Sequence, residues 1–583
     1  MRRLILGVLT AAALAQVPLE DRRNTYTPDP ETHFIMPDHP SLGAWRRRRR
    51  ELRAQILAAA GLLPARSRAP LESRVVWKAA RSGVIIETVL LETLPGYYVG
   101  GNVYRPAGAP GRLPAVLSPH GHWKRGRIEN EPSYSVPALG INLARQGYLV
   151  FAWDMVGYND TRQTSHHFGG WREQLWGFSP MGLQLWNALR SLDYVRARRD
   201  VDSGRIAVTG ASGGATQTFL LTAVDSRVQC AAPVNMISAY MQGGDPCEEA
   251  PGLRAGTFNV EFAAMAAPRP MLVVSSTGDW TRHTPREEFP ALRRIYGLFG
   301  VPGRVANAHF EAKHNYNRES RNAVYGFLAG WMLGGGVGVD TADRDIELPD
   351  PEELLAVRHT SLPADALDFE GVFRVWREAA RREVRAAPDS RVREALRHAC
   401  GAEWPRRIDS AVEGKRLVLA RTGRRDRVAG IWMPGAGPPA LVVHPDGAEA
   451  ALASPQGREL AAAGRFVYAI DAFQTGSSVA PRDRSGPWFL SYNHTDDANR
   501  VQDILTALAF LRSQTRGRPR LVGLGAAAPW CLFAAAVAPV ETELAVDLDG
   551  FEGRDEDFRD RFFVPGIQAA GGLEGALRLV RAR

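Results

Sequence analysis

Short apolar runs alternate with longer amphipathic segments over residues 114–335. Such runs are long enough for buried strands and too short for helices. The predicted strands are residues 114–117, 148–153, 206–209, 230–234, 271–275 and 305–308. The segments between them with helical spacing are residues 135–146, 182–196 and 215–224. Strands that alternate with helices predict an α/β fold with a mostly parallel, doubly wound sheet.

A strand-rich segment precedes this alternating region. Residues 75–78, 84–92 and 98–104 are rich in β-forming side chains and are separated by Ser-Gly and Pro-Gly pairs. Turn residues between such runs predict an antiparallel lead-in to the sheet. We assign the first α/β domain to residues 74–338 and an N-terminal helical segment to residues 16–73.

The strand pattern starts again in the last third of the chain. Residues 339–389 form an acidic, proline-bearing linker with a predicted helix at 369–386. Beyond it, residues 464–471 (G-R-F-V-Y-A-I-D) resemble residues 147–154 (G-Y-L-V-F-A-W-D). A chain of 583 residues is also too long for one core, so we predict a second, similar domain over residues 390–583.

The first fifteen residues have the features of an export signal. Arg2 and Arg3 precede an apolar stretch that ends in Ala13-Leu14-Ala15, an A-x-A cleavage pattern. This predicts a secreted or periplasmic protein whose mature chain starts at Gln16. No later apolar run is long enough to cross a bilayer, so we expect no membrane insertion.

Composition and charge add little to this picture. Hydrophobic residues make up 45% and charged residues 23% of the chain, as in ordinary globular proteins. The net charge of +9 is spread out except for five arginines at residues 46–50, which continue into a predicted helix as a solvated face. We therefore expect no nucleic-acid partner.

Four cysteines in so long a chain are too few for a disulfide framework. Cys230 and Cys247 are close enough in sequence to pair, whereas Cys400 and Cys531 resemble small buried apolar residues.

The strongest chemical signal is G-A-S-G-G at residues 210–214. It lies between the predicted strand 206–209 and the predicted helix 215–224, which is the setting of a nucleophile elbow. A glycine-rich turn with a chance serine is the alternative. The flanking strand and helix favour Ser212 as a nucleophile.

Two further groups follow predicted strands, where the ligand-binding edge of a parallel sheet lies. Asp279 comes after strand 271–275, and His314 after strand 305–308, with His309 as a second candidate base. The chain order Ser212, Asp279, His314 is that of a hydrolase triad. His314 would accept the serine proton, and Asp279 would orient the imidazole.

The loop after strand 114–117 contains His120-Gly121-His122. Together with the N–H of Gly213, backbone at Gly121 and His122 is expected to bind an oxyanion. A His-x-His pair also suits a metal. No carboxylate or cysteine lies beside it at ligand spacing, so we predict no metal and no cofactor.

Tryptophans occur in the segments after three of the strands, at Trp123, Trp171 and Trp280. If exposed, they would form a wall that binds sugar rings; if buried, they are packing residues only.

Several segments together resemble a known family over residues 85–335: S-P-H-G-H-W, G-L-Q-L-W-N, G-A-S-G-G, A-A-P-R-P-M-L-V-V, T-G-D-W-T and K-H-N-Y-N. They are similar to the α/β-hydrolase fold and, within it, to bacterial acetyl xylan esterase-like carbohydrate esterases. The resemblance implies hydrolysis of carboxylic esters, acetyl esters foremost, on plant cell-wall saccharides.

Glucuronoyl esterases are similar more distantly. In that family an arginine usually follows the nucleophile, where this chain has Gly213. The position of the acid varies among such enzymes, so Glu261 is an alternative acid.

The expected activity is therefore that of a secreted serine esterase working through an acyl-enzyme. A prolyl-oligopeptidase-like peptidase would share the triad order, but no propeller-like repeat is present. A dienelactone-hydrolase-like enzyme would normally have a cysteine nucleophile. A non-catalytic saccharide-binding protein would not need three triad residues in order.

The second domain is predicted to lack this chemistry. Residues 520–530 align with residues 205–215, which puts Ala527 in the place of Ser212. The spacings from Ser212 to Asp279 and His314 would carry both partners past residue 583. We predict a degenerate, truncated α/β-hydrolase-like domain.

Overall fold

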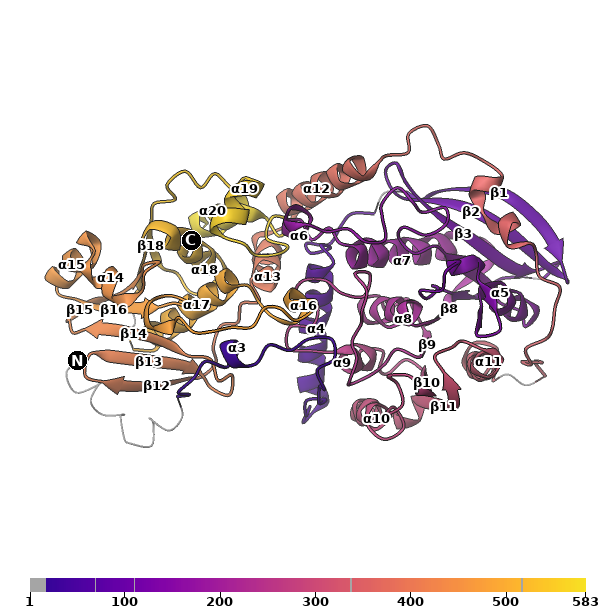
Figure 1. The fold of residues 1–583 in the computed structure, drawn as a ribbon, viewed down its shortest axis with the longest axis horizontal. Coiled ribbons are helices and arrows are strands. Elements are labelled where there is room, and N and C mark those ends of the chain that lie inside the picture. Colours follow the sequence, from indigo (N-terminus) through magenta and orange to yellow (C-terminus); the bar gives the residue numbers. More distant parts are fainter. Residues whose placement is uncertain (1–16, 69, 110, 336–337, 515–516, 583) are drawn as a thin grey trace.

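The computed structural model describes residues 17–68, 70–109, 111–335, 338–514 and 517–582. The predicted export signal, residues 1–15, lies outside the described residues. Figure 1 shows two lobes, each built on its own sheet, with helix α4 (Leu42–Ala59) standing between them. We call them the larger lobe (strands β1–β11) and the smaller lobe (strands β12–β18).

The larger lobe contains a nine-stranded sheet in the order β1-β2-β3-β7-β4-β8-β9-β10-β11. Its strands are β1 (Glu72–Arg81), β2 (Val84–Leu94), β3 (Tyr97–Pro106), β4 (Leu113–Leu117), β7 (Leu149–Trp153), β8 (Val201–Ala211), β9 (Cys230–Val234), β10 (Met271–Gly278) and β11 (Val305–Lys313). From β1 to β7 neighbouring strands are antiparallel. From β7 to β11 they are parallel. The predicted antiparallel lead-in and the parallel sheet are both confirmed.

Helices pack on both faces of this sheet (Figure 1). They are α5 (Val136–Arg145), α6 (Trp171–Leu175), α7 (Pro180–Ala197), α8 (Gly213–Val224), α9 (Asn259–Ala264), α10 (Glu288–Leu298) and α11 (Arg318–Met332). A separate two-stranded ribbon consists of β5 (Asn130–Glu131) and β6 (Tyr134–Ser135). Helix α7 begins at Pro180, two residues before the predicted start at residue 182, because Ser179 caps it by accepting a hydrogen bond from the N–H of Gly182 and Pro180 suits the first turn. Strands β4, β7 and β9 are buried throughout, which explains their unbroken apolar sequences.

The smaller lobe contains a seven-stranded sheet in the order β12-β13-β14-β16-β15-β17-β18. Its strands are β12 (Ile408–Glu413), β13 (Arg416–Arg421), β14 (Val428–Met433), β15 (Gly437–Val443), β16 (Arg465–Asp471), β17 (Arg520–Gly523) and β18 (Glu543–Val546). Its helices are α14 (Ala448–Ala453), α15 (Pro455–Ala462), α16 (Phe489–Tyr492), α17 (Asp496–Gln514), α18 (Ala528–Val537), α19 (Asp555–Arg561) and α20 (Gly572–Arg581).

The second sheet repeats the first seven strands of the larger sheet. Strands β12 to β18 follow the order and directions of β1, β2, β3, β4, β7, β8 and β9, including the inserted central strand. Counterparts of β10 and β11 are absent from the described part of this lobe. Ala527 precedes helix α18 as Ser212 precedes α8, but its φ of −82° is ordinary helical backbone. The described part of the second domain therefore resembles the first seven strands of the larger sheet and lacks the strained turn.

The two lobes share one buried core. A single apolar cluster contains Trp45 of α4, Trp176 of the larger lobe, Trp376 of α12 (Phe369–Ala386) and Phe533 of the smaller lobe. Backbone hydrogen bonds also cross between the lobes, from Gly566 N–H to the carbonyl of Gln174 at 2.7 Å. Helix α13 (Asp389–Ala399) packs against α4. Removing the smaller lobe would thus expose apolar surface of the larger one.

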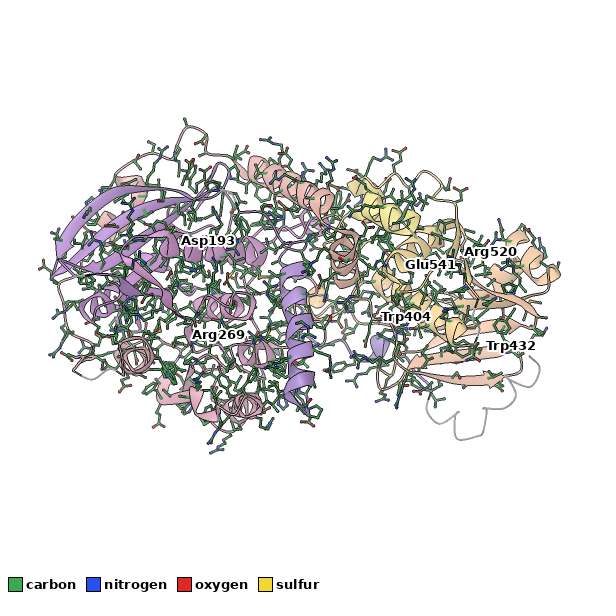
Figure 2. All side chains as sticks on the ribbon, turned by 180° about the vertical axis from the view of Figure 1, so that it is seen from behind. Asp193, Arg269, Trp404, Trp432, Arg520 and Glu541 are labelled. Atoms are coloured by element: carbon green, nitrogen blue, oxygen red, sulfur yellow. The ribbon has the colours of Figure 1, made fainter. Side chains whose placement is uncertain are left out.

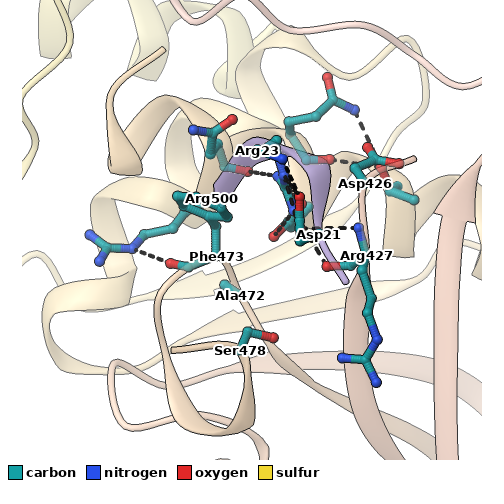
Figure 3. Close-up of polar contacts among 12 residues, drawn as sticks. Asp21, Arg23, Asp426, Arg427, Ala472, Phe473, Ser478 and Arg500 are labelled. Atoms are coloured by element: carbon teal, nitrogen blue, oxygen red, sulfur yellow. Dashed lines mark hydrogen bonds and ion pairs between the residues drawn. The ribbon is translucent and has the colours of Figure 1, made fainter. Parts of the chain in front are cut away.

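The N-terminal segment ties into the smaller lobe (Figure 3). Arg23 of the short helix α3 (Arg22–Thr25) pairs with Asp503 of α17 at 2.6 Å and with Asp21. The N–H of Arg427 donates to Asp21 at 3.1 Å. The described part of the chain therefore begins on the smaller lobe and passes along α4 into the larger one.

Figure 2 shows the side chains of both lobes and labels Asp193 and Arg520, each of which forms ion pairs. Asp193 of α7 binds Arg68 and Arg227, and Arg520 of β17 binds Glu543.

No helix in the described ranges has the length and apolar character that crossing a bilayer requires.

All four cysteines are free and buried, so the possible bond between Cys230 and Cys247 is not formed.

Candidate active site

Ser212 lies on the turn between β8 and α8, with φ 57° and ψ −126°. A non-glycine residue in this region of backbone space costs about 1–3 kcal/mol and is held there by its surroundings. Both flanking glycines are required: a Cβ on Gly210 would lie 2.4 Å, and one on Gly214 2.3 Å, from the carbonyl oxygen of Pro119. The turn has the strained strand–turn–helix form that the G-x-S-x-G pattern predicts.

The register of β10 and β11 brings Asp279 and His314 together. Gly278 of β10 pairs with Lys313 of β11 at the ends of the two strands. The residues that follow them, Asp279 and His314, are therefore neighbours as well. A Cβ on Gly278 would lie 2.7 Å from the carbonyl oxygen of Ala312, so only glycine permits this approach. The Nδ1–H of His314 donates to Oδ2 of Asp279 at 2.9 Å.

Asp279 is held on its other side by a residue that sequence reasoning missed. Its Oδ1 accepts hydrogen bonds from the backbone N–H of Thr281 at 2.7 Å and from the Thr281 hydroxyl at 2.5 Å. The carboxylate is only 2% exposed. The signal for Thr281 was the D-x-T spacing, which is typical of side chain–backbone turns.

The second ring nitrogen of His314 is available. Nε2 is buried and has no hydrogen-bond partner among the described residues, so the Ser212 hydroxyl does not bond to it in this structure. Catalytic hydrogen bonds are often long without substrate and shorten in the complex. The hydrogen bond between Asp279 and His314 is formed, whereas the hydrogen bond between Ser212 and His314 is not.

Two of the three predicted tryptophans lie against His314. The Trp123 ring stacks on the imidazole at 5.6 Å between centroids, and the Trp280 ring lies at 4.6 Å. Both indoles are partly exposed. Trp171 does not belong to this site: it starts α6 and packs under the guanidinium of Arg559 of the smaller lobe at 4.9 Å. Trp171 therefore packs between the two lobes and is not part of the predicted substrate-binding wall.

The three predicted oxyanion donors differ in whether their N–H groups already have a hydrogen-bond acceptor. The N–H of Gly121 already donates to the hydroxyl of Tyr134 at 3.2 Å. Gly213 is the first residue of α8, so its N–H lacks an intrahelical acceptor and lies at the positive end of the helix dipole. Within the described ranges, the N–H of His122 also has no protein acceptor. The geometry favours Gly213 and His122 over Gly121.

Gly213 is glycine because the His122 ring lies on it. A Cβ there would be 2.5 Å from Cε1 of His122. An arginine in this position, as in glucuronoyl esterases, would have to displace that ring.

The other two histidine candidates are structural. Met155 N–H donates to Nε2 of His120 at 2.9 Å, and burial lowers the pKa of His120 to about 3, which keeps the ring neutral. His309 lies within β11 and bonds to the hydroxyl of Ser275 on β10 at 2.8 Å.

Glu261, the alternative acid, pairs with α4 instead of His314. Its carboxylate accepts hydrogen bonds from Arg48 at 2.6 and 2.8 Å and from the Thr257 hydroxyl at 2.6 Å. Burial alone would raise the pKa of Glu261, but the bonds from Arg48 outweigh it and hold the pKa at about 2. The structure gives this carboxylate a role in attaching α4 to the larger lobe.

Glu261 should therefore stabilise the fold in a pH-dependent way. A drop from 4.5 to about 2 in pKa corresponds to about 3 kcal/mol, since one unit is worth about 1.4 kcal/mol. Because the folded-state pKa is depressed, this contribution is complete above pH 4.5 and is lost as pH falls toward 2. We expect Glu261→Gln to lower the free energy of unfolding at pH 7 and to match the wild type more closely at pH 3.

Urea unfolding at both pH values measures this difference, with Glu459→Gln on an exposed face of α15 as the control. A stability loss that is the same at pH 7 and pH 3 would contradict the ion-pair explanation.

The fold also assembles a cluster that the sequence did not reveal. His122, His166, Asp245 and Cys247 place one donor atom each within 4.8 Å of one another. Sequence reasoning excluded a metal because no carboxylate or cysteine lies near the His-x-His pair. That reasoning was incomplete, because Cys247 lies 125 residues from His122 in the chain and 3.1 Å from it in space.

Known hydrolases and esterases are similar to this chain. No family model matches the chain. "Putative hydrolase YtaP" of Bacillus subtilis (strain 168) is 28% identical over 312 residues, which cover 49% of this chain and all of that protein. The solved structure "Methylesterase BT1017" is 30% identical with a TM-score of 0.50 and covers 60% of this chain and 78% of its own. A glucuronoyl esterase from Solibacter usitatus is 16% identical with a TM-score of 0.39, over 55% of this chain and 100% of that one.

Proposed function

Because this chain belongs to the α/β-hydrolase superfamily, we propose that it is a serine carboxylic-ester hydrolase acting on esterified saccharides. The observation that carries the proposal is the pair formed by Asp279 and His314 at the sheet edge where the strained turn holds Ser212. A strained serine, an oriented imidazole and a buried carboxylate are the parts of a serine hydrolase.

In the proposed reaction, Nε2 of His314 accepts the hydroxyl proton of Ser212 as the serine oxygen attacks the ester carbonyl. The N–H groups of Gly213 and His122 stabilise the resulting oxyanion. When this intermediate collapses, the alcohol leaves with the proton from His314, and the acyl group stays on Ser212. Water, activated by the same histidine, then releases the acid. No cofactor takes part in these steps.

Two kinds of ester are candidates for the substrate. The sequence resemblance favours acetyl groups on plant cell-wall saccharides, in which the acyl-enzyme is a simple acetate. Similarity to a methylesterase favours methyl esters of saccharide carboxylates, in which methanol leaves and the saccharide forms the acyl-enzyme. The partly exposed rings of Trp123 and Trp280 beside His314 suit a sugar in either case.

We also propose that residues 74–338 form the catalytic domain and residues 390–583 a non-catalytic one. The absence of strands equivalent to β10 and β11 from the described part of the smaller lobe supports this division. Residues 1–15 support export to the periplasm or the medium.

A panel of acetylated and methyl-esterified polysaccharides, with acetate and methanol measured separately, tests the proposal. We expect one of the two products in large excess, and no cleavage of a chromogenic prolyl peptide. Peptide cleavage without ester cleavage would contradict the proposal and favour a peptidase.

A further inference from the structure

The side chains of His122, His166, Asp245 and Cys247 form a cluster beside the nucleophile turn, and the proposed reaction uses none of them, since His122 takes part only through its backbone N–H. His122 follows β4, His166 follows β7, and the other two residues follow β9. Strands β4 and β9 flank β8, whose end carries Ser212, and β7 lies on the other side of β4. Three separate loops therefore meet at one point next to the candidate active site.

The distances within the cluster suit a small cation. Nε2 of His122 lies 3.1 Å from Sγ of Cys247 and 3.6 Å from Oδ1 of Asp245. Nε2 of His166 lies 2.9 Å from the same carboxylate oxygen. Bonds of about 2.0–2.3 Å around a tetrahedral zinc ion place neighbouring donors about 3.3–3.7 Å apart. All four donors lie within 4.8 Å of one another, so shifts of up to about 1 Å would bring them to that spacing.

The orientation of His166 supports a ligand role. Its Nδ1 lies 2.5 Å from the carbonyl oxygen of Val156, so Nδ1 carries the proton and Nε2 carries the lone pair of a neutral ring. Nε2 is buried and lies within ion-pair distance of Asp245, but it has hydrogen-bond geometry to no residue in the described ranges. The imidazole of His166 and the carboxylate of Asp245 are therefore close, but their angles do not suit a hydrogen bond. Metal-binding histidines show this arrangement, because the second ring nitrogen is anchored by a carbonyl.

Asp245 is positioned in a similar way by its own loop. Its Oδ1 accepts the N–H of Cys247 at 3.2 Å, which turns the carboxylate and the thiol to the same side.

The local charge also favours a divalent cation. Binding would release the Cys247 thiol proton to solvent, and one thiolate with one carboxylate would neutralise a doubly charged ion in this largely buried place. The neighbouring Glu248 is buried and accepts bonds from Thr216 and Gly244, but within the described residues it forms no ion pair. The surroundings thus contain excess negative charge.

We propose that these four side chains bind one zinc-class divalent ion. Two imidazoles, a thiolate and a carboxylate are ligands that zinc accepts, and four protein ligands make a closed, structural site. The ion joins the three loops around the nucleophile turn. It holds the His122 ring in its place on Gly213, where Cε1 leaves no room for a Cβ.

The test uses the full-length chain without a histidine tag, stripped with a chelator and then dialysed against zinc chloride. Elemental analysis should find one zinc ion per chain. Cobalt(II) in place of zinc should give the strong visible bands of tetrahedral coordination and a thiolate-to-cobalt charge-transfer band in the near ultraviolet. The wild-type spectrum tests the site even if a variant fails to fold.

Cys247→Ser should abolish the charge-transfer band, whereas Cys230→Ser, which removes a buried cysteine outside the cluster, should keep it. His166→Gln should weaken zinc binding at least tenfold, and His167→Gln, at a ring that is 71% exposed, should not. Less than stoichiometric zinc in the wild type, or a cobalt spectrum without a thiolate band, would overturn the proposal. Equal losses from His166→Gln and His167→Gln would also overturn it.

Discussion

Replacing Ser212 by alanine is expected to lower ester turnover by a factor of about 10³–10⁶ while the protein stays folded. The loss is large because the triad acts as a unit: without the serine oxygen no acyl-enzyme forms, and His314 and Asp279 have nothing to activate. Folding should survive because alanine keeps the Cβ and adds no strain at a φ of 57°.

Steady-state hydrolysis of a small chromogenic ester measures the effect. The exposed Ser226 offers a matched control, since Ser226→Ala removes the same atom two residues after the end of α8. A serine-directed phosphonate should label the wild type and the control on the peptide that carries Ser212, and should not label the Ser212 variant. Labelling of another serine, or turnover near the wild-type rate in Ser212→Ala, would refute the assignment of the nucleophile.

Asp279→Asn is expected to reduce kcat by about 10⁴. Asparagine can accept from Thr281 or donate toward His314, but it cannot supply the negative charge that stabilises the imidazolium. It also favours the tautomer that leaves Nε2 protonated and unable to accept the serine proton. The loss should appear in kcat rather than in KM, because the buried carboxylate lies behind the histidine.

Glu261→Gln is the matched control, because it makes the same acid-to-amide change in a buried carboxylate that pairs with Arg48. Its activity per folded molecule should stay within a few-fold of the wild type, with circular dichroism establishing the folded fraction. If Glu261→Gln proves the more damaging of the two, the catalytic acid is Glu261, as in the alternative drawn from the glucuronoyl esterase resemblance.

The sequence alone determined the architecture of the larger lobe and the repeat in the smaller one. Buried strands such as β4 and β9 have unbroken apolar sequences, and the turn at Ser212 has two glycines that local packing requires. Such features are local in the chain. The alignment of Ala527 with Ser212 needed only the repeat itself, and the order of the second sheet agrees with it.

Only the tertiary structure decided which side chains share a site. The register of β10 and β11 places Asp279 beside His314. Glu261 instead forms its ion pair with Arg48 of α4. Trp171 belongs to the interface between the lobes, because the smaller lobe places Arg559 over its ring. The cluster around Cys247 forms because three loops leave the same edge of a parallel sheet. Contacts between loops depend on which strands are neighbours, and the spacing of residues along the chain does not contain that information.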